Sequence, residues 1–343
     1  MTGKNVLIIC SDEHSRSALG CYGNSIVQTP ALDKLAGKGM RFSRAYTPSP
    51  ICVSARASLA TGTHVHENQC WSSSQPFHGQ HDSWMRRLRD HDHATASVGN
   101  LHYRSGNDDN GFSEEILPMY LANDGKGWPH GLIRNPMPGF EEAREMAREV
   151  GPGESTYTEY DRGIASEASK WLRQSPKALK DKPWALFVSF ISPHYPLIAP
   201  QEFFDLYSNA PMPETIAGGH NQKPDHPVLK EMAKFWDYDS HFDEETRDRA
   251  KRSYFGLCSF LDDNIRQVLE ALEDSGSARD TVVIYITDHG EMLGNHGFWA
   301  KSVMYEDAVG IPLIMAGNEV PVGVNHTPVS LTDIAATVEG LVG

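Results

Sequence analysis

Three short apolar runs, each followed at once by polar or charged residues, constrain the fold of this chain most. They are residues 5–10, 184–190 and 281–287. A continuous apolar run of this length is typical of a strand buried on both faces, as in a parallel sheet that helices cover. Ligands of such α/β sheets bind beyond the carboxyl ends of the strands. The residues that follow each run are therefore the first candidates for chemistry.

Acidic residues follow the first and the last of these runs. Asp12 and Glu13 come after the first, and Asp288 and His289 come after the last. If both strands lie side by side in a parallel sheet, two carboxylates and an imidazole meet around one cation. The alternative is that these residues lie in a solvent-exposed loop and bind nothing, as adjacent carboxylates more often do. We predict that Asp12, Asp288 and His289 hold a cation, with Glu13 as an additional candidate.

The segment 47–62 changes from a proline-bearing loop to helix-forming residues. Two prolines prevent a helix before Cys52, and the alanine-rich residues after it favour a helix that Gly62 ends. Cys52 is thus expected at a helix N-terminus, where free N–H groups and the helix dipole favour an anion or a thiol of low pKa. Arg56, one turn later, would direct a positive charge toward it. The alternative for Cys52 is a structural cysteine packed in a well-capped helix.

Several residues of this segment stand in an uncommon order. They are Cys52, Ser54, Arg56, Leu59, Thr61 and Gly62. Their order resembles the signature of the sulfatases, a family of the alkaline phosphatase superfamily. The resemblance implies that a formylglycine-generating enzyme converts Cys52 to formylglycine. It also implies that the hydrated aldehyde is the nucleophile and contacts the cation. The resemblance covers nearly the whole chain.

Further residues match positions where sulfatases carry anion-binding and catalytic groups. The resemblance implies that His194 and Lys301 contact the sulfate, that Arg56 balances charge, and that His102 takes a proton. Asn100 stands where the family commonly has a lysine, so one anion-binding cation is missing or comes from elsewhere. Without the resemblance, His102 is more often a hydrogen-bonded structural histidine. A turn histidine between two prolines is the alternative for His194.

The resemblance implies hydrolysis of a sulfate monoester with one divalent cation. Oxygen ligands favour Ca²⁺, our first expectation, or Mg²⁺, while His289 shifts the balance toward Mn²⁺. The Asp-His pair also occurs in members that resemble choline-sulfatases and phosphonate monoester hydrolases. Cleavage of a phosphonate monoester or a phosphodiester is therefore a second hypothesis. A third, motivated by Asn100, is a catalytically silent homologue that binds anions. Two-zinc phosphatase chemistry would need further His and Asp clusters.

The implied fold is α/β, an alkaline-phosphatase-like central, mostly parallel sheet with helices on both faces. We expect one catalytic domain over residues 1–343. Residues 104–155 and 209–242 bear many Gly, Pro and polar residues and are predicted as irregular loops near the site, with substrate contacts in the first. Sulfatases usually continue into a smaller C-terminal subdomain, which we expect to be absent or shortened here.

The composition bears on partners and location. A formal net charge of −14 argues against general nucleic-acid binding. The sequence has no apolar run long enough for a membrane span and no signal-peptide pattern at its start, which predicts a cytoplasmic protein. Five cysteines without paired spacing disfavour a disulfide framework. The expected partners are a small sulfate, phosphonate or phosphate ester and the formylglycine-generating enzyme, and a homo-oligomer is left open.

Overall fold

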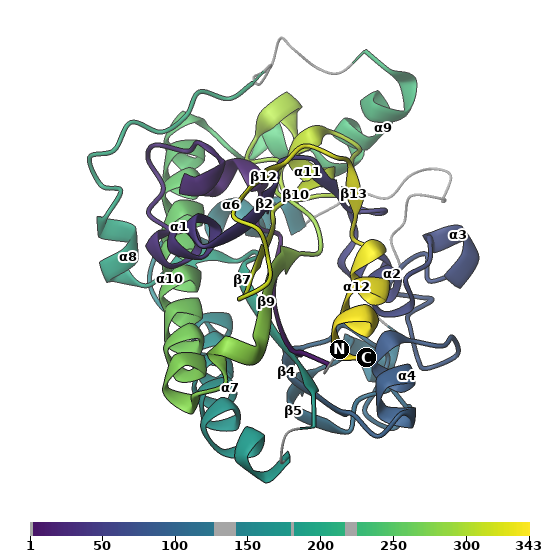
Figure 1. Ribbon diagram of the computed structural model, residues 1–343. Coiled ribbons are helices and arrows are strands. Elements are labelled where there is room, and N and C mark those ends of the chain that lie inside the picture. The colour runs from purple at the N-terminus through teal and green to yellow at the C-terminus, as the bar shows by residue number, and fades with distance from the viewer. Residues whose placement is uncertain (1–2, 127–141, 180–181, 217–224) are drawn as a thin grey trace.

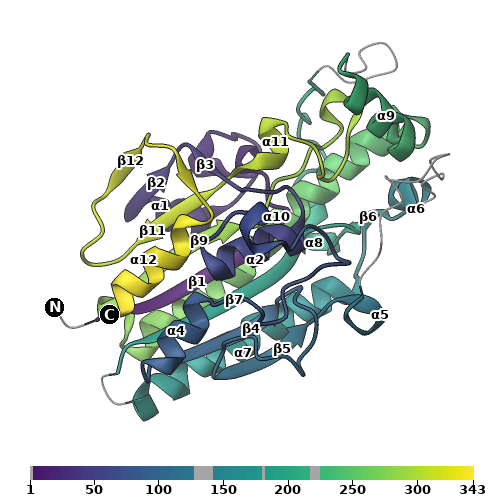
Figure 2. The same cartoon turned by 90° about the vertical axis from the view of Figure 1, so that its right-hand side faces the viewer.

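The computed structural model describes residues 3–126, 142–179, 182–216 and 225–343, which build an α/β fold around an eight-stranded sheet (Figure 1). Figure 2 shows the strands side by side across the sheet. In spatial order they are β12 (Gly323–Asn325), β2 (Gly39–Phe42), β11 (Leu313–Ala316), β9 (Thr281–Thr287), β1 (Asn5–Asp12), β7 (Trp184–Pro193), β4 (Ala94–Asn100) and β5 (Glu114–Met119). Strand β11 runs antiparallel to both neighbours, and the other pairings are parallel. The predicted mostly parallel sheet is confirmed.

Helices cover both faces of the sheet (Figure 1). One face carries α2 (Cys52–Thr61), α4 (Trp84–Asp90) and α12 (Asp333–Val342), and the other carries α1 (Pro30–Gly37), α7 (Thr156–Leu179) and α10 (Glu244–Ser275). Strand β1 shows why the middle of its sequence, residues 6–10, is apolar. Val6 and Ile8 pack toward the first group of helices, and Leu7 and Ile9 pack toward the second. Both faces of this central strand are therefore buried.

Shorter elements complete the described chain. The helices are α3 (Val65–Asn68), α5 (Ala122–Gly125), α6 (Glu142–Arg148), α8 (Gln201–Asp205), α9 (Pro227–Trp236) and α11 (Glu306–Val309). The strands are β3 (Ala45–Tyr46), β6 (Val150–Pro152), β8 (Leu197–Ala199), β10 (Gly310–Ile311) and β13 (Val329–Ser330). Strands β10, β3 and β13 form one small sheet, and β6 and β8 form another.

The predicted loops are only partly irregular. Strands β5 and β6 and helices α5 and α6 lie within residues 104–155, and α9 lies within residues 209–242. The prediction failed at β5 because this strand lies at the sheet edge, where two glutamates and a proline hide the apolar pattern. The parts of the predicted loops at residues 127–141 and 217–224 lie outside the described residues.

Two further expectations concern a disulfide framework and a membrane span. All five cysteines are free. Among the described residues, no helix combines the length and the apolar character that a bilayer crossing requires.

Candidate active site

The carboxyl ends of β1 and β9 bring Asp12 and Asp288 together. The two strands pair in parallel, with Ser11 opposite Thr287, so the next residue of each stands at the same edge of the sheet. Both aspartate side chains are fully buried. The backbone N–H of Glu13 donates to Oδ1 of Asp288 at 3.2 Å. The two acidic segments, separated by most of the chain, therefore meet as the sequence predicts.

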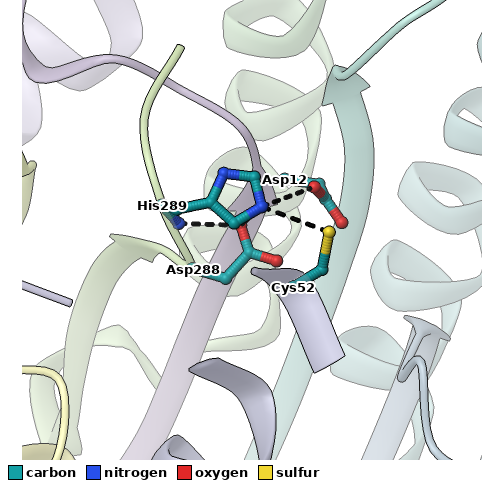
Figure 3. A group of neighbouring side chains, drawn as sticks. All are labelled: Asp12, Cys52, Asp288 and His289. Atoms are coloured by element: carbon teal, nitrogen blue, oxygen red, sulfur yellow. Dashed lines mark hydrogen bonds and ion pairs between the residues drawn. The ribbon is translucent and has the colours of Figure 1, made fainter. Parts of the chain in front are cut away.

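Cys52 and His289 complete a compact group with the two aspartates (Figure 3). Cys52 is the first residue of α2, at the loop-to-helix change that was predicted. Nε2 of His289 lies 3.2 Å from Sγ of Cys52 and 3.7 Å from Oδ1 of both Asp12 and Asp288. One ligand atom from each of the four residues lies within 4.8 Å of the others.

This four-residue group fits a divalent cation. Oδ1 of Asp12 is buried and has no hydrogen-bond partner within the described part of the chain, an arrangement that is costly unless an opposite charge faces it. Nδ1 of His289 lies 3.1 Å from the carbonyl oxygen of Gly290. A proton on Nδ1 leaves the lone pair of Nε2 directed at the carboxylates, as a metal ligand requires. The donor set suits Ca²⁺, Mg²⁺ or Mn²⁺.

Arg56 is the counter-charge of the two aspartates. Its side chain is buried and donates from Nε to Oδ2 of Asp288 at 2.8 Å and from a terminal nitrogen to Oδ2 of Asp12 at 3.1 Å. Its other terminal nitrogen donates to the carbonyl oxygen of Asn100 at 2.7 Å. Burial alone would raise the pKa of Asp12, but the guanidinium of Arg56 holds it well below its usual range. The carboxylate therefore stays ionised.

The thiol of Cys52 is not activated, and the prediction of a low pKa is wrong. Burial and the carboxylate of Asp12 raise the pKa of Cys52 well above its usual value, and Lys301 offsets this only in part. The helix N-terminus at the start of α2 lowers the pKa of Cys52 less than burial and the surrounding carboxylates raise it. Without a bound cation, an unmodified Cys52 would stay protonated and be a poor nucleophile.

Glu13 faces a different set of groups from Asp12. Its φ is +68°, and its Oε2 lies 3.0 Å from Nζ of Lys301 and 3.3 Å from Nε2 of His194. It is outside the four-residue group and belongs to a second one with Asp12 and His194. The hydroxyl of Tyr254 donates to the carbonyl oxygen of Glu13 at 2.7 Å and holds this turn from α10. No sequence signal pointed to this contact.

The end of β4 adds Asn100 and His102 to the site. Nδ2 of Asn100 donates to Oδ2 of Asp12 at 3.2 Å, and Nδ1 of His102 lies 3.5 Å from the same oxygen. Burial lowers the pKa of His102 to about 3, so its imidazole is neutral at pH 7. The ring of Tyr157, which no sequence signal singled out, packs edge-on against His194 with 6.3 Å between ring centroids.

Lys301 follows a loop that Glu291 closes. Oε1 of Glu291 accepts hydrogen bonds from the backbone N–H groups of Leu293 and Ala300, both at 2.7 Å. Leu293 and Ala300 have positive φ values of 49° and 56°, a region that non-glycine residues rarely adopt. The buried carboxyl of Glu291 thus joins the two ends of an otherwise unfavourable loop.

Replacing Glu291 with alanine should lower the free energy of unfolding by about 2–4 kcal/mol, because two backbone N–H groups lose their acceptor. Burial and the Glu13 carboxylate raise the pKa of Glu291 well above its usual value. Glu291→Gln resembles the protonated acid and keeps the acceptor oxygen, so it should retain wild-type stability. Denaturant unfolding of both variants measures the difference. Equal losses in the two variants would contradict the acceptor role.

Comparison with known proteins identifies the family of this chain. A family model described as Sulfatase matches residues 4–343. The chain belongs to the sulfatase family. This family member is 29% identical to choline-sulfatase of Rhizobium meliloti (strain 1021) over 352 residues, an alignment that covers 100% of this chain and 68% of that enzyme.

Solved structures of other proteins share the fold of this chain. Phosphonate monoester hydrolase of Agrobacterium radiobacter superposes with a TM-score of 0.81 at 22% identity, over 99% of this chain and 74% of that chain. A protein solved in complex with its substrate D-glucosamine-2-N,6-O-disulfate superposes with a TM-score of 0.74 at 20% identity, over 99% of this chain and 77% of that chain. The resemblance to the sulfatase family, including its choline-sulfatase and phosphonate monoester hydrolase members, is confirmed.

Proposed function

We propose that this sulfatase-family chain hydrolyses sulfate monoesters with a formylglycine made from Cys52 and one divalent cation. The observation that supports this most is the meeting of Cys52 with Asp12, Asp288 and His289 in one group at the carboxyl edge of the sheet. A cation held by these residues would neutralise charge on the ester and lower the pKa of a bound hydroxyl. Ca²⁺ is the first choice for a donor set rich in oxygen, followed by Mg²⁺ and Mn²⁺.

The surrounding side chains would bind and orient the anionic group. Lys301 and His194 both lie close to Glu13 and would contact the sulfuryl oxygens. Arg56 keeps both aspartates ionised and in place. His102, neutral and with Nδ1 directed at Asp12, would accept a proton at Nε2. Hydrated formylglycine at position 52 would supply the attacking oxygen.

Hydrolysis of a phosphonate monoester or phosphodiester is the second candidate function. The pair Asp288 and His289 favours it, together with the fold shared with the phosphonate monoester hydrolase of Agrobacterium radiobacter. Paired assays on 4-nitrophenyl sulfate and 4-nitrophenyl phenylphosphonate separate the two, using protein coexpressed with a formylglycine-generating enzyme and checked by intact mass. We expect a higher kcat/KM for the sulfate ester. The reverse order would favour the second candidate, and turnover of neither would favour a silent anion-binding protein.

Removing the cation should stop turnover and lower thermal stability. A cation that binds only the folded state adds about 2.7 kcal/mol of stability at 100 times its Kd. We therefore expect EDTA to lower the melting temperature and Ca²⁺, Mg²⁺ or Mn²⁺ to restore it, as measured by scanning fluorimetry. Asp12→Asn is the matched control and should lose this response, since Asp12 belongs to the four-residue group. A wild-type melting temperature that does not change with EDTA or with any of the three ions would contradict the cation site.

A further inference from the structure

A buried carboxylate lies beside Lys301 and His194, the two side chains that would receive the substrate. Glu13 is 1% exposed, and its Oε2 is 3.0 Å from Nζ of Lys301 and 3.3 Å from Nε2 of His194. Its Oε1 is also buried and has no hydrogen-bond partner in the parts of the chain that the structure describes. Glu13 therefore offsets the positive charge of Lys301 before any anion binds.

The fixed charges around position 52 nearly balance. Asp12, Glu13 and Asp288 contribute three negative charges, and Arg56 and Lys301 contribute two positive charges. One bound divalent cation would leave a single net positive charge. A monoanionic ester would then make this buried site neutral. A dianionic ester would leave one uncompensated negative charge, which is costly away from water.

We infer that Glu13 is a specificity-determining residue, which selects monoanionic esters against dianionic phosphate monoesters. The inference rests on the proposed hydrolase function and gives Glu13 a role other than that of a cation ligand. The repulsion between the Glu13 carboxylate and the substrate grows with each negative charge that the substrate carries. A sulfate monoester and a phosphonate monoester carry one such charge, and a phosphate monoester carries two at pH 8.

A second divalent cation bound by Asp12, Glu13 and His194 is the competing assignment. One ligand atom of each residue lies within 4.8 Å of the others. Lys301 argues against this assignment, because its ammonium group already lies 3.0 Å from Glu13 and would repel an added cation. The two assignments differ in the number of cations that each chain binds.

The test compares three esters that share 4-nitrophenol as leaving group, namely the sulfate, the phenylphosphonate and the phosphate. In Glu13→Gln, kcat/KM for the phosphate relative to the sulfate should rise by about tenfold or more. The ratio of kcat/KM between the sulfate and the phenylphosphonate should stay within about twofold of its wild-type value, because both esters carry one charge and gain equally from the loss of the carboxylate. Glu13→Asp keeps the charge and should keep the wild-type ratios. Where hydrolysis of the phosphate ester is too slow to measure, its inhibition constant against hydrolysis of the sulfate ester replaces its kcat/KM.

Cation content, measured by elemental analysis, completes the test. We expect one divalent cation per chain in the wild type and in Glu13→Gln. An unchanged ratio of phosphate to sulfate in Glu13→Gln would overturn the inference and leave the proposed function standing. Two cations in the wild type, or a cation lost in Glu13→Gln, would overturn it in favour of a ligand role. If the fully converted wild type turns over neither monoanion, the proposed function fails, and the dissociation constants of the three esters, measured by calorimetry in the wild type and in Glu13→Gln, then decide whether Glu13 selects by charge.

Discussion

Cys52→Ala should lower kcat/KM for 4-nitrophenyl sulfate by at least about 10⁴-fold, because the proposed nucleophile is made from this side chain. In the cation-free protein, burial and neighbouring carboxylates raise the pKa of the unmodified Cys52 thiol well above its usual value. Cys21→Ala is the matched control, since Cys21 is a free cysteine outside the four-residue group. It should keep wild-type turnover. Sulfate hydrolysis that survives in Cys52→Ala would contradict the proposed chemistry.

Arg56→Met should lower the free energy of unfolding of the cation-free protein by about 3–5 kcal/mol. Arg56 is buried and bridges Asp12 and Asp288, so its loss leaves two adjacent buried carboxylates without a counter-charge. Denaturant unfolding in EDTA measures this loss. The deficit should shrink when a divalent cation is added, because the ion supplies positive charge at the same carboxylates.

Arg266→Ala is the control for Arg56→Met. Arg266 is an exposed residue of α10 that pairs with Asp263 and Glu270, and surface pairs of this kind contribute less than about 1 kcal/mol. A loss in Arg56→Met that is no larger than the loss in Arg266→Ala would contradict the bridging role. An Arg56→Met deficit that a saturating cation leaves unchanged would show that the ion binds elsewhere.

The buried strands and the four-residue group are what the sequence predicts best. Residues 5–10 and 281–287 form apolar runs because both faces of β1 and β9 are covered. Such a run can be recognised in the sequence without knowing which elements pack against it. Once both runs are placed in one parallel sheet, the pairing of Asp12 with Asp288 follows from their positions, Asp12 two residues after the first run and Asp288 one residue after the second. The helix start at Cys52 follows from local proline and alanine content.

The contacts that the sequence did not predict come from backbone conformation and distant elements. Glu13 is adjacent to Asp12 in sequence, but its left-handed φ directs the carboxylate to Lys301 instead of the four-residue group. Tyr254 reaches the same turn from α10, about two-thirds of the chain away, and shows no local signal of that role. Asn100 looked like the loss of a lysine, whereas its side-chain amide hydrogen-bonds Asp12.

Sulfate ester turnover measured against the fraction of Cys52 converted to formylglycine tests the proposed nucleophile most directly, with the fraction read from intact mass and the cation kept saturating. We expect a straight line through the origin. Turnover by unconverted protein, or none by fully converted protein, would contradict it.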